Sequence, residues 1–355
     1  MTSTIRRACR TRRTTAIAVS LAAGSTLAST GIAGADTART GSPAPAASAP
    51  IKQGLYQSAY SERNDALWVT SSVGLPPVTD SALLKVDPDT LRVEKAYTPP
   101  VTDAATGAVE AVYGVAVDDE HNTVWTTNTR DNTVAVYSQH SGRRLATLPG
   151  VNHAREVVVD ERRDTVWASA FGDGTLVSFD SRTFKEKKRV TVPGSGPTGL
   201  ALNERTGTVY AADHNGGRII EASPGAESAR LVPTGEGPLS ITLSKNGRTA
   251  YTADQTAGTV SVVDLRKGAV ARSVPVGGGT KSVAVDRRSG HVLAVNRTSA
   301  TVTVVDPRKG AVVKSVATGA NPNHVQVSNG TAYVVDKSAS GPAGEDRLTR
   351  IGLRR

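Results

Sequence analysis

Charged side chains occupy two neighbouring positions of a repeated strand where most other repeats carry small or neutral residues. Arg155 and Glu156 hold both positions in one repeat, with His153 just upstream. Basic, acidic and imidazole groups at one site can form charge-assisted hydrogen bonds, which are stronger than neutral ones. Such a set fits a small anionic or zwitterionic ligand. The alternative is that Arg155 and Glu156 merely neutralise each other at a hydrated opening.

The same two positions can be aligned across the repeats. The Glu156 column, four residues before the end of the strand, contains Gly114, Glu156, Gly199, Ser240, Ser282 and His324. The Arg155 column, one residue earlier, contains Tyr113, Arg155, Thr198, Leu239, Lys281 and Asn323. The departures from small or neutral residues are Arg155, Glu156, Lys281 and His324. With nearby His153 and two further members of the Arg155 column, our candidate ligand contacts are Tyr113, His153, Arg155, Glu156, Lys281, Asn323 and His324.

The sequence predicts neither a catalytic residue nor a metal site. Its six histidines form no HxH pair and no close cluster with carboxylates, the arrangements that transition metals favour. A GxSxG elbow and a phosphate-binding loop are also missing. We therefore expect no cofactor, and binding rather than catalysis.

A repeat of about 42 residues supplies the elements that would position these side chains. The large apolar residue of TVWTTN (123–128) recurs at one register, as Trp125, Trp167, Tyr210, Tyr251, Leu293 and Tyr333. Trp68 marks a further copy upstream, displaced by an insertion. Each copy holds four short alternating strands separated by polar turns, which is one propeller blade. Seven copies predict an all-β, seven-bladed β-propeller of four-stranded antiparallel blades.

Burial explains why the blades should close into a ring. A blade that is apolar on both faces can bury them only against neighbouring blades. The recurring large apolar residue is then a wedge between blades rather than a ligand platform. The last repeat has only three strands and ends with RLTRIG (347–352), which leaves an open edge. We expect residues 51–56 to pair there as the outer strand of blade 7.

The strings TVSVVD and AYVVD resemble the YVTN-repeat β-propellers of secreted and surface-layer proteins, over residues ~55–355. The resemblance implies the fold, whereas propellers serve both as enzymes and as inert scaffolds. Some members of this family bind single-stranded nucleic acid, which requires aromatic residues interleaved with basic ones. Only Phe184 lies near the basic turns here, so we do not expect nucleic acid as a partner.

The first 35 residues have the pattern of a secretory signal peptide. Five arginines precede an apolar stretch of small residues, and Ala33-Gly34-Ala35 predicts cleavage before Asp36. Either the general secretory or the twin-arginine route is compatible with Arg12-Arg13. Residues 36–50 are predicted to be a flexible linker and 51–355 the propeller. We expect a secreted, extracellular monomer with no membrane span in the mature chain.

The charge of the mature chain is modest. Five of the 42 basic residues lie in 1–35, which leaves 37 against 32 acidic residues, an excess of +5. This excess does not by itself favour a polyanionic partner.

Insertions select one face of the predicted ring. Loops that join consecutive blades, and loops between second and third strands, share what we call the top face. The irregular segments 71–82, 98–112 and 337–346 all fall there, which is typical of a binding face. Basic pairs such as Arg287-Arg288 fall on the bottom face, where we expect solvation. The predicted function is top-face binding of a small ligand or cell-surface partner. The alternatives are a lactone or ester hydrolase and a quinoprotein-dehydrogenase-like subunit.

Overall fold

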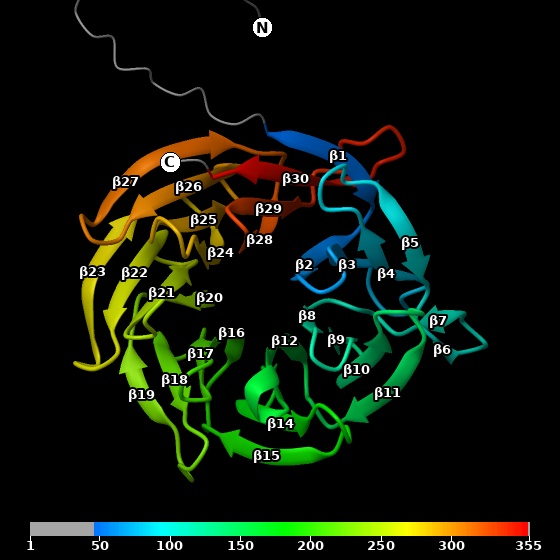
Figure 1. Ribbon diagram of the computed structural model, residues 1–355, viewed down its shortest axis with the longest axis horizontal. Coiled ribbons are helices and arrows are strands. Elements are labelled where there is room, and N and C mark those ends of the chain that lie inside the picture. The colour runs from blue at the N-terminus through cyan, green and yellow to red at the C-terminus, as the bar shows by residue number, and fades with distance from the viewer. Residues whose placement is uncertain (1–45, 354–355) are drawn as a thin grey trace, which may run out of the picture. The chain divides into compact units, whose positions relative to one another are not determined.

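The structure is a computed structural model that describes residues 46–353. These residues form seven four-stranded antiparallel sheets arranged as blades around a central channel (Figure 1). The helical element among them is one 3-10 turn, η1 (Glu161–Arg163), and no described helix has the length and apolar character to cross a bilayer. The predicted all-β, seven-bladed architecture is confirmed.

The strands of blades 1 to 4 are given from the channel outward. Blade 1 contains β2 (Leu55–Ser61), β3 (Ala66–Val73), β4 (Asp80–Val86) and β5 (Val93–Tyr97). Blade 2 contains β8 (Val115–Asp118), β9 (Thr123–Asn128), β10 (Thr133–Ser138) and β11 (Arg144–Pro149). Blade 3 contains β12 (Ala154–Asp160), β13 (Thr165–Ala170), β14 (Thr175–Asp180) and β15 (Glu186–Thr191). Blade 4 contains β16 (Pro197–Asn203), β17 (Thr208–Asp213), β18 (Arg218–Ala222) and β19 (Arg230–Pro233).

The remaining three blades follow the same order. Blade 5 contains β20 (Pro238–Leu243), β21 (Thr249–Asp254), β22 (Thr259–Asp264) and β23 (Ala269–Pro275). Blade 6 contains β24 (Thr280–Val285), β25 (Val292–Asn296), β26 (Thr301–Asp306) and β27 (Ala311–Ala317). Blade 7 contains β28 (Pro322–Ser328), β29 (Thr331–Asp336), β30 (Asp346–Gly352) and β1 (Ala47–Lys52).

The core lies between blades, as the recurring apolar residue predicted. Trp68 of blade 1 is fully buried against Val115 and Val124 of blade 2, and its indole N–H donates to Gln139 at 3.0 Å. At the last junction Tyr333 of blade 7 packs in one cluster with the first strands of blade 1. Each such wedge removes apolar surface from water at about 25 cal/mol per Å², which favours the closed ring over separate blades.

The two ends of the described chain meet in blade 7, where β1 lies beside β30 (Figure 1). The two strands are antiparallel, with Ala47 opposite Arg350 and Pro50 opposite Arg347. An N-terminal strand therefore closes the ring as predicted, but it is β1, which shares only Ile51 and Lys52 with the predicted segment 51–56. Residues from Leu55 onward form β2, the innermost strand of blade 1.

This placement corrects the predicted linker as well. Residues 47–50 already belong to the sheet, so the propeller begins before residue 51. The composition of residues 47–50 is typical of a linker, yet it is compatible with an outer strand. One edge of an outer strand has no partner strand, so Pro50, which lacks a backbone N–H, is tolerated there. The predicted signal peptide at 1–35 and the linker up to residue 45 lie outside the described residues.

A buried carboxylate reinforces the closure. Asp346, at the start of β30, is 3% exposed and accepts hydrogen bonds from the backbone N–H groups of Gly54 and Leu55 at 2.7 and 3.0 Å. Its second oxygen accepts the N–H of Ala339 at 3.0 Å. One side chain thereby fixes the turn between β1 and β2 to the loop before β30. Hydrogen bonds to a charged acceptor contribute about 1.5–3 kcal/mol each.

The irregular segments lie in loops of the top face. The first forms the connection between β3 and β4, and the second contains a small hairpin of β6 (Val101–Asp103) and β7 (Ala108–Val109). The two touch each other, since the N–H of Val109 donates to the carbonyl of Val78 at 2.8 Å. The third connects β29 and β30.

Removal of β1 should open the ring. A chain that starts at Gln53 loses the cross-strand pairing with β30, and at about 1 kcal/mol per hydrogen bond this costs several kcal/mol. We expect its thermal midpoint to fall by roughly 10 °C in calorimetry. A chain that starts at Ala46 retains β1 and is the matched control, with the midpoint of the full chain. Equal midpoints for both truncated chains would contradict closure by β1.

Candidate functional site

The first strands of the blades enclose a channel of about 560 Å³. Because these strands run from the top face to the bottom face, residues at their beginnings surround the top opening. All seven candidate contacts predicted from the sequence lie on the wall of this channel: Tyr113, His153, Arg155, Glu156, Lys281, Asn323 and His324. Their role as ligand contacts stays a prediction.

The Glu156 column forms a belt of hydrogen bonds around the channel. Each innermost strand has one edge without a partner strand, and its N–H groups need acceptors. Side chains of the column supply these acceptors to the following blade, at 3.2 Å from Val115 N to Gln57, 3.2 Å from Val283 N to Ser240, 3.2 Å from Val325 N to Ser282, and 3.3 Å from Ser58 N to His324. We call this arrangement the inner belt.

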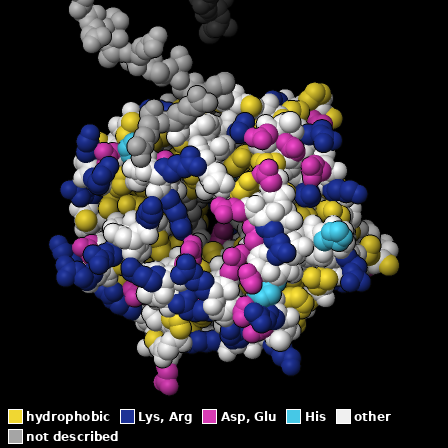
Figure 2. Space-filling model, viewed as in Figure 1, with side chains coloured by type: hydrophobic (Ala, Val, Ile, Leu, Met, Phe, Trp, Pro, Cys, Tyr) yellow, Lys and Arg dark blue, Asp and Glu magenta, His cyan; other side chains and the backbone are white. Residues whose placement is uncertain are grey.

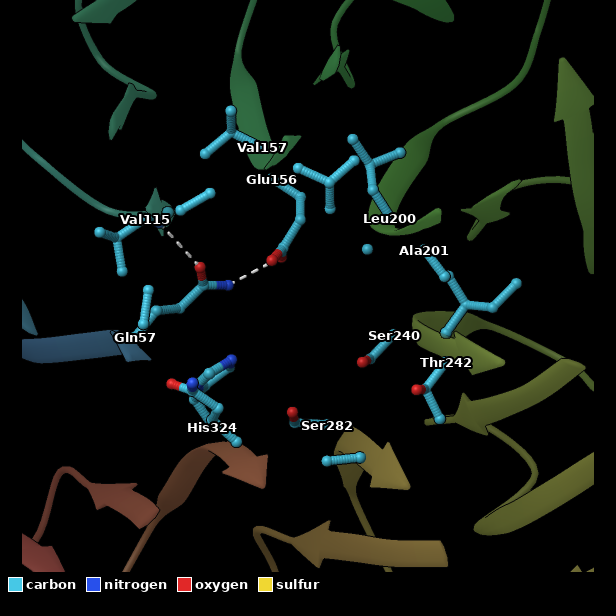
Figure 3. Close-up of a pocket in the computed structure, with 18 of the residues that line it drawn as sticks. Gln57, Val115, Glu156, Val157, Leu200, Ala201, Ser240, Thr242, Ser282 and His324 are labelled. Carbon is cyan, nitrogen blue, oxygen red and sulfur yellow. Dashed lines mark hydrogen bonds between the residues drawn. The ribbon is translucent and has the colours of Figure 1, made fainter. Parts of the chain in front are cut away.

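Glu156 departs from the inner belt. Its carboxylate accepts the side-chain N–H of Gln57 at 2.8 Å, while the amide oxygen of Gln57 accepts Val115 N (Figure 3). The side chain of Gln57 in blade 1 thus contacts Glu156 in blade 3 across Gly114 of blade 2. A Cβ at position 114 would lie 2.7 Å from the carbonyl oxygen of Arg155 and 3.3 Å from the amide oxygen of Gln57. Glycine at this position therefore leaves room for the bridge.

Burial changes the protonation of two groups in the channel. Desolvation raises the pKa of Glu156 to about 7, against smaller opposing effects of the Gln57 hydrogen bond and Arg155. Desolvation also lowers the pKa of His324 to about 4, so this imidazole is neutral at pH 7. Because Nδ1 of His324 accepts Ser58 N, the neutral ring carries its proton on Nε2. Figure 3 shows His324, Ser282, Ser240 and Glu156 around the same cavity.

Five cations gather at the top opening, and we call them the mouth cluster: Arg130, Arg155, Lys281, Arg297 and Lys337. Three of them line the channel, whereas Arg297 and Lys337 lie behind the lining. Among residues 46–353, none of the five forms an ion pair. Burial, and then Arg155, Arg297 and Lys337, lower the pKa of Lys281 to about 8.

Tyr56 connects the mouth cluster to the belt. Its ring packs edge-on against Tyr113 with centroids 4.4 Å apart, and the ammonium of Lys337 lies 3.5 Å from its centroid. Its carbonyl accepts the side-chain N–H of Asn323 at 2.7 Å, and the amide oxygen of Asn323 in turn accepts a hydrogen bond from Arg297. Burial raises the pKa of Tyr56, so its hydroxyl stays protonated.

Arg155 and Glu156 do not neutralise each other through a direct pair. No ion pair joins them among the described residues, and the guanidinium of Arg155 lies 5.7 Å from the ring centroid of Phe171. Arg155 has only the third-largest effect on the pKa of Glu156. Glu156 is nevertheless the charge with the largest effect on the pKa of Arg155, so the two residues interact without a direct ion pair.

Sequence reasoning missed five residues of this site: Tyr56, Gln57, Arg130, Arg297 and Lys337. Gln57 stands eleven residues before Trp68, as Gly114 stands eleven before Trp125, so the register alone identifies Tyr56 and Gln57 as the blade 1 members of both columns. Arg297 and Lys337 share another register, directly after the second strand of their blades. That register was not aligned in the sequence, although it carries the same signal.

The bottom end of the channel has a different charge. In blades 1 to 4 the turns between first and second strands carry Glu62, Asp119, Glu161 and Glu204, and Glu204 lines the channel. In the face shown in Figure 2 the channel opens as a central hollow bordered by acidic side chains. Arg287 also lines this end and pairs with Glu204 at 3.3 Å. This end of the channel therefore carries charges of both signs, whereas the charged side chains that line the top opening are mainly cationic.

The part of the chain that the structure describes holds no group of three His, Cys, Asp or Glu side chains arranged for a metal ion. The chemistry that this site supports is the binding of negative charge by guanidinium and ammonium groups, with Asn323 and two tyrosines as neutral hydrogen-bonding neighbours.

The fold and the channel define a seven-bladed β-propeller with a cationic mouth on its top face. Among solved structures, a streptogramin B lyase matches with a TM-score of 0.71 at 11% identity, over 87% of this chain and 98% of the lyase. The virginiamycin B lyase from Staphylococcus aureus matches with a TM-score of 0.70 at 10% identity, over 87% and 100%. No protein-family model and no curated protein matches the sequence. At these identities the likeness shows the fold alone, and the resemblance to YVTN-repeat proteins stays a prediction.

Replacement of Glu156 by Gln should stabilise the protein at alkaline pH. The folded-state pKa of about 7 exceeds the ordinary value of 4.5. The free energy of unfolding of the wild type is therefore highest below pH 4.5, where Glu156 is neutral, and it falls as pH rises through 7. At pH 8 we expect E156Q to gain up to roughly 3 kcal/mol over wild type, a rise of several degrees in midpoint. At pH 4 the two should coincide, which is the internal control. Coincident midpoints at pH 8 would show that ionisation of Glu156 is not opposed by burial.

Proposed function

We propose that the protein binds a small anionic ligand, such as a carboxylate or a phosphate, at the top opening of its channel. The observation that carries this proposal is the mouth cluster, in which four blades bring five cations together without an ion-pair partner among the described residues. Like charges held together destabilise the folded chain, and an anion among them offsets that repulsion.

The geometry also supports a ligand that is small. The channel volume of about 560 Å³ lies within the range of small-molecule sites, and the cations reach its wall from opposite sides of the ring. The neutral Nε2–H of His324 and the hydroxyls of Ser240 and Ser282 can donate to the same ligand deeper in the channel.

Catalysis on the bound ligand is the second candidate. Glu156 has a pKa of about 7 inside the channel, which is the value expected of a group that takes and returns a proton near neutral pH. Two solved structures with this fold are named as lyases. Conversion of a bound ligand by wild type and not by E156Q would support this candidate over binding alone.

We propose that binding takes place outside the cell, with the protein as a monomer. The support is the signal-peptide pattern of residues 1–35 and the modest net charge of the rest of the chain. Terminal sequencing of protein recovered from the culture medium tests this, since cleavage before Asp36 is expected and an intact Met1 would contradict it.

Substitution of Arg155 or Lys281 by Ala should weaken anion binding by about 5- to 150-fold, or 1–3 kcal/mol, because each removes a charge-assisted hydrogen bond. Phosphate, citrate and pyruvate serve as probes, first by thermal shift and then by titration calorimetry. A ligand of the folded state raises the thermal midpoint. Affinity should also fall with added salt.

The control for this experiment is Arg308→Ala, whose side chain is 83% exposed on the bottom face. Arg287 is less suitable because it lines the lower end of the channel. Unchanged affinity in R155A and K281A, with a loss in R308A, would move the site to the bottom face. If none of the anions binds the wild type, the proposed function is wrong.

A further inference from the structure

Of the two lysines in the mouth cluster, Lys281 is the one whose side chain has no described polar partner. It is the second residue of β24 and belongs to the Arg155 column, lines the channel and has no hydrogen-bond or ion-pair partner among residues 46–353. The flanking strands contribute Leu239 and Asn323 at the same register, and neither side chain carries a charge. The amine of Lys281 is thus a free group that faces the space where the anion binds.

Lys337 provides the contrast. The pKa of both lysines is lowered to about 8, in each case first by burial. The ammonium of Lys337, however, donates to the carbonyl of Leu55 at 3.0 Å, lies over the ring of Tyr56 and does not line the channel. Lys337 is therefore held as a cation in the wall, whereas Lys281 is not held by any described partner.

Resting on the proposed anion site, we propose that Lys281 captures carbonyl-bearing anions, namely 2-oxo acids and aldehyde acids, as a reversible imine at the channel mouth. Arg155, in the same column of blade 3, is positioned to bind the carboxylate. The ligand then presents its carbonyl carbon within the same opening to Lys281. Lysines placed among other cations in partly desolvated sites are the ones that act as amine nucleophiles.

The covalent step is balanced without any added oxidant or reductant. The lone pair of the Lys281 amine forms a bond to the carbonyl carbon, and the carbonyl π pair moves to oxygen, which takes up a proton. Loss of water from this carbinolamine gives the C=N bond. The net change is amine plus carbonyl to imine plus water, and hydrolysis reverses it.

The charges around Lys281 make the free amine available near neutral pH. The groups that act on it are Arg155 of β12, Arg297 after β25 and Lys337 after β29, and all three favour the uncharged amine. With a pKa of about 8, roughly one amine in ten is unprotonated at pH 7, compared with fewer than about one in a thousand for an ordinary lysine. Capture should therefore increase as pH rises through 8.

Reductive trapping tests the inference on the intact protein. Wild type is incubated with pyruvate or glyoxylate and cyanoborohydride at pH 7, and digested for mass spectrometry. We expect the carboxyethyl or carboxymethyl adduct on Lys281 to exceed that on Lys337 or exposed Lys95 by at least about tenfold. Lactate, which has the carboxylate of pyruvate and no carbonyl, should compete and lower the yield. Lys281→Arg has no primary amine that can form an imine, so it should lose the adduct, whereas Lys95→Arg, on the exposed outer strand β5, should keep the adduct at Lys281.

The outcomes separate this inference from the proposed function. If lactate and pyruvate bind in calorimetry but Lys281 is not labelled, or is labelled no more than Lys337 and Lys95, imine capture is wrong and anion binding stands. If lactate, pyruvate, glyoxylate, citrate and phosphate all fail to bind, both are wrong.

Discussion

Closure of the ring between blades 7 and 1 is the constraint on which the channel mouth depends. The pairing of β1 with β30 and the carboxylate of Asp346 join segments nearly 300 residues apart. Tyr56 receives Asn323 and Lys337 across the same seam, and His324 accepts from Ser58 there. These contacts link the two ends of the chain, so they exist only in the closed ring. The part of the site that Tyr56, Asn323 and His324 form therefore depends on the closure between blades 7 and 1.

The inner belt shows how a propeller can vary its channel without losing its fold. Strand pairing uses one edge of each innermost strand, and the belt satisfies N–H groups of the other edge with short side chains such as Ser240 and Ser282. Gly114 and Gly199 occupy two column positions without a side chain. Glu156 can therefore leave the belt and accept from Gln57 instead, at little cost to the sheets. Departures from the repeat are tolerated here because the ladder hydrogen bonds do not depend on them.

Fixed register explains why much of the site was predictable from the sequence. Equivalent positions of successive repeats occupy the same place in each blade, so the columns through Arg155 and Glu156 predicted residues of the channel wall without coordinates. The closing strand was predicted in kind but misplaced, because Pro50 and its small neighbours lack the pattern of a paired strand. Because residues 51–56 were assigned to blade 7, the columns were not extended to Tyr56 and its neighbour Gln57. Arg297 and Lys337 were missed for another reason, since the register directly after the second strands was not aligned and their burial depends on tertiary contacts.

The two lysines of the mouth show why charge and burial alone do not assign a role. Desolvation lowers the pKa of Lys281 and Lys337 alike, yet only Lys281 lines the channel, because a carbonyl and an aromatic ring hold Lys337 in the wall. The same reasoning applies to the likeness with the two lyases, whose sequences are only 11% and 10% identical to this chain although the fold is shared. A shared ring fixes where seven side chains converge. The identity of those side chains, and which of them are left without partners, determines what the channel can bind.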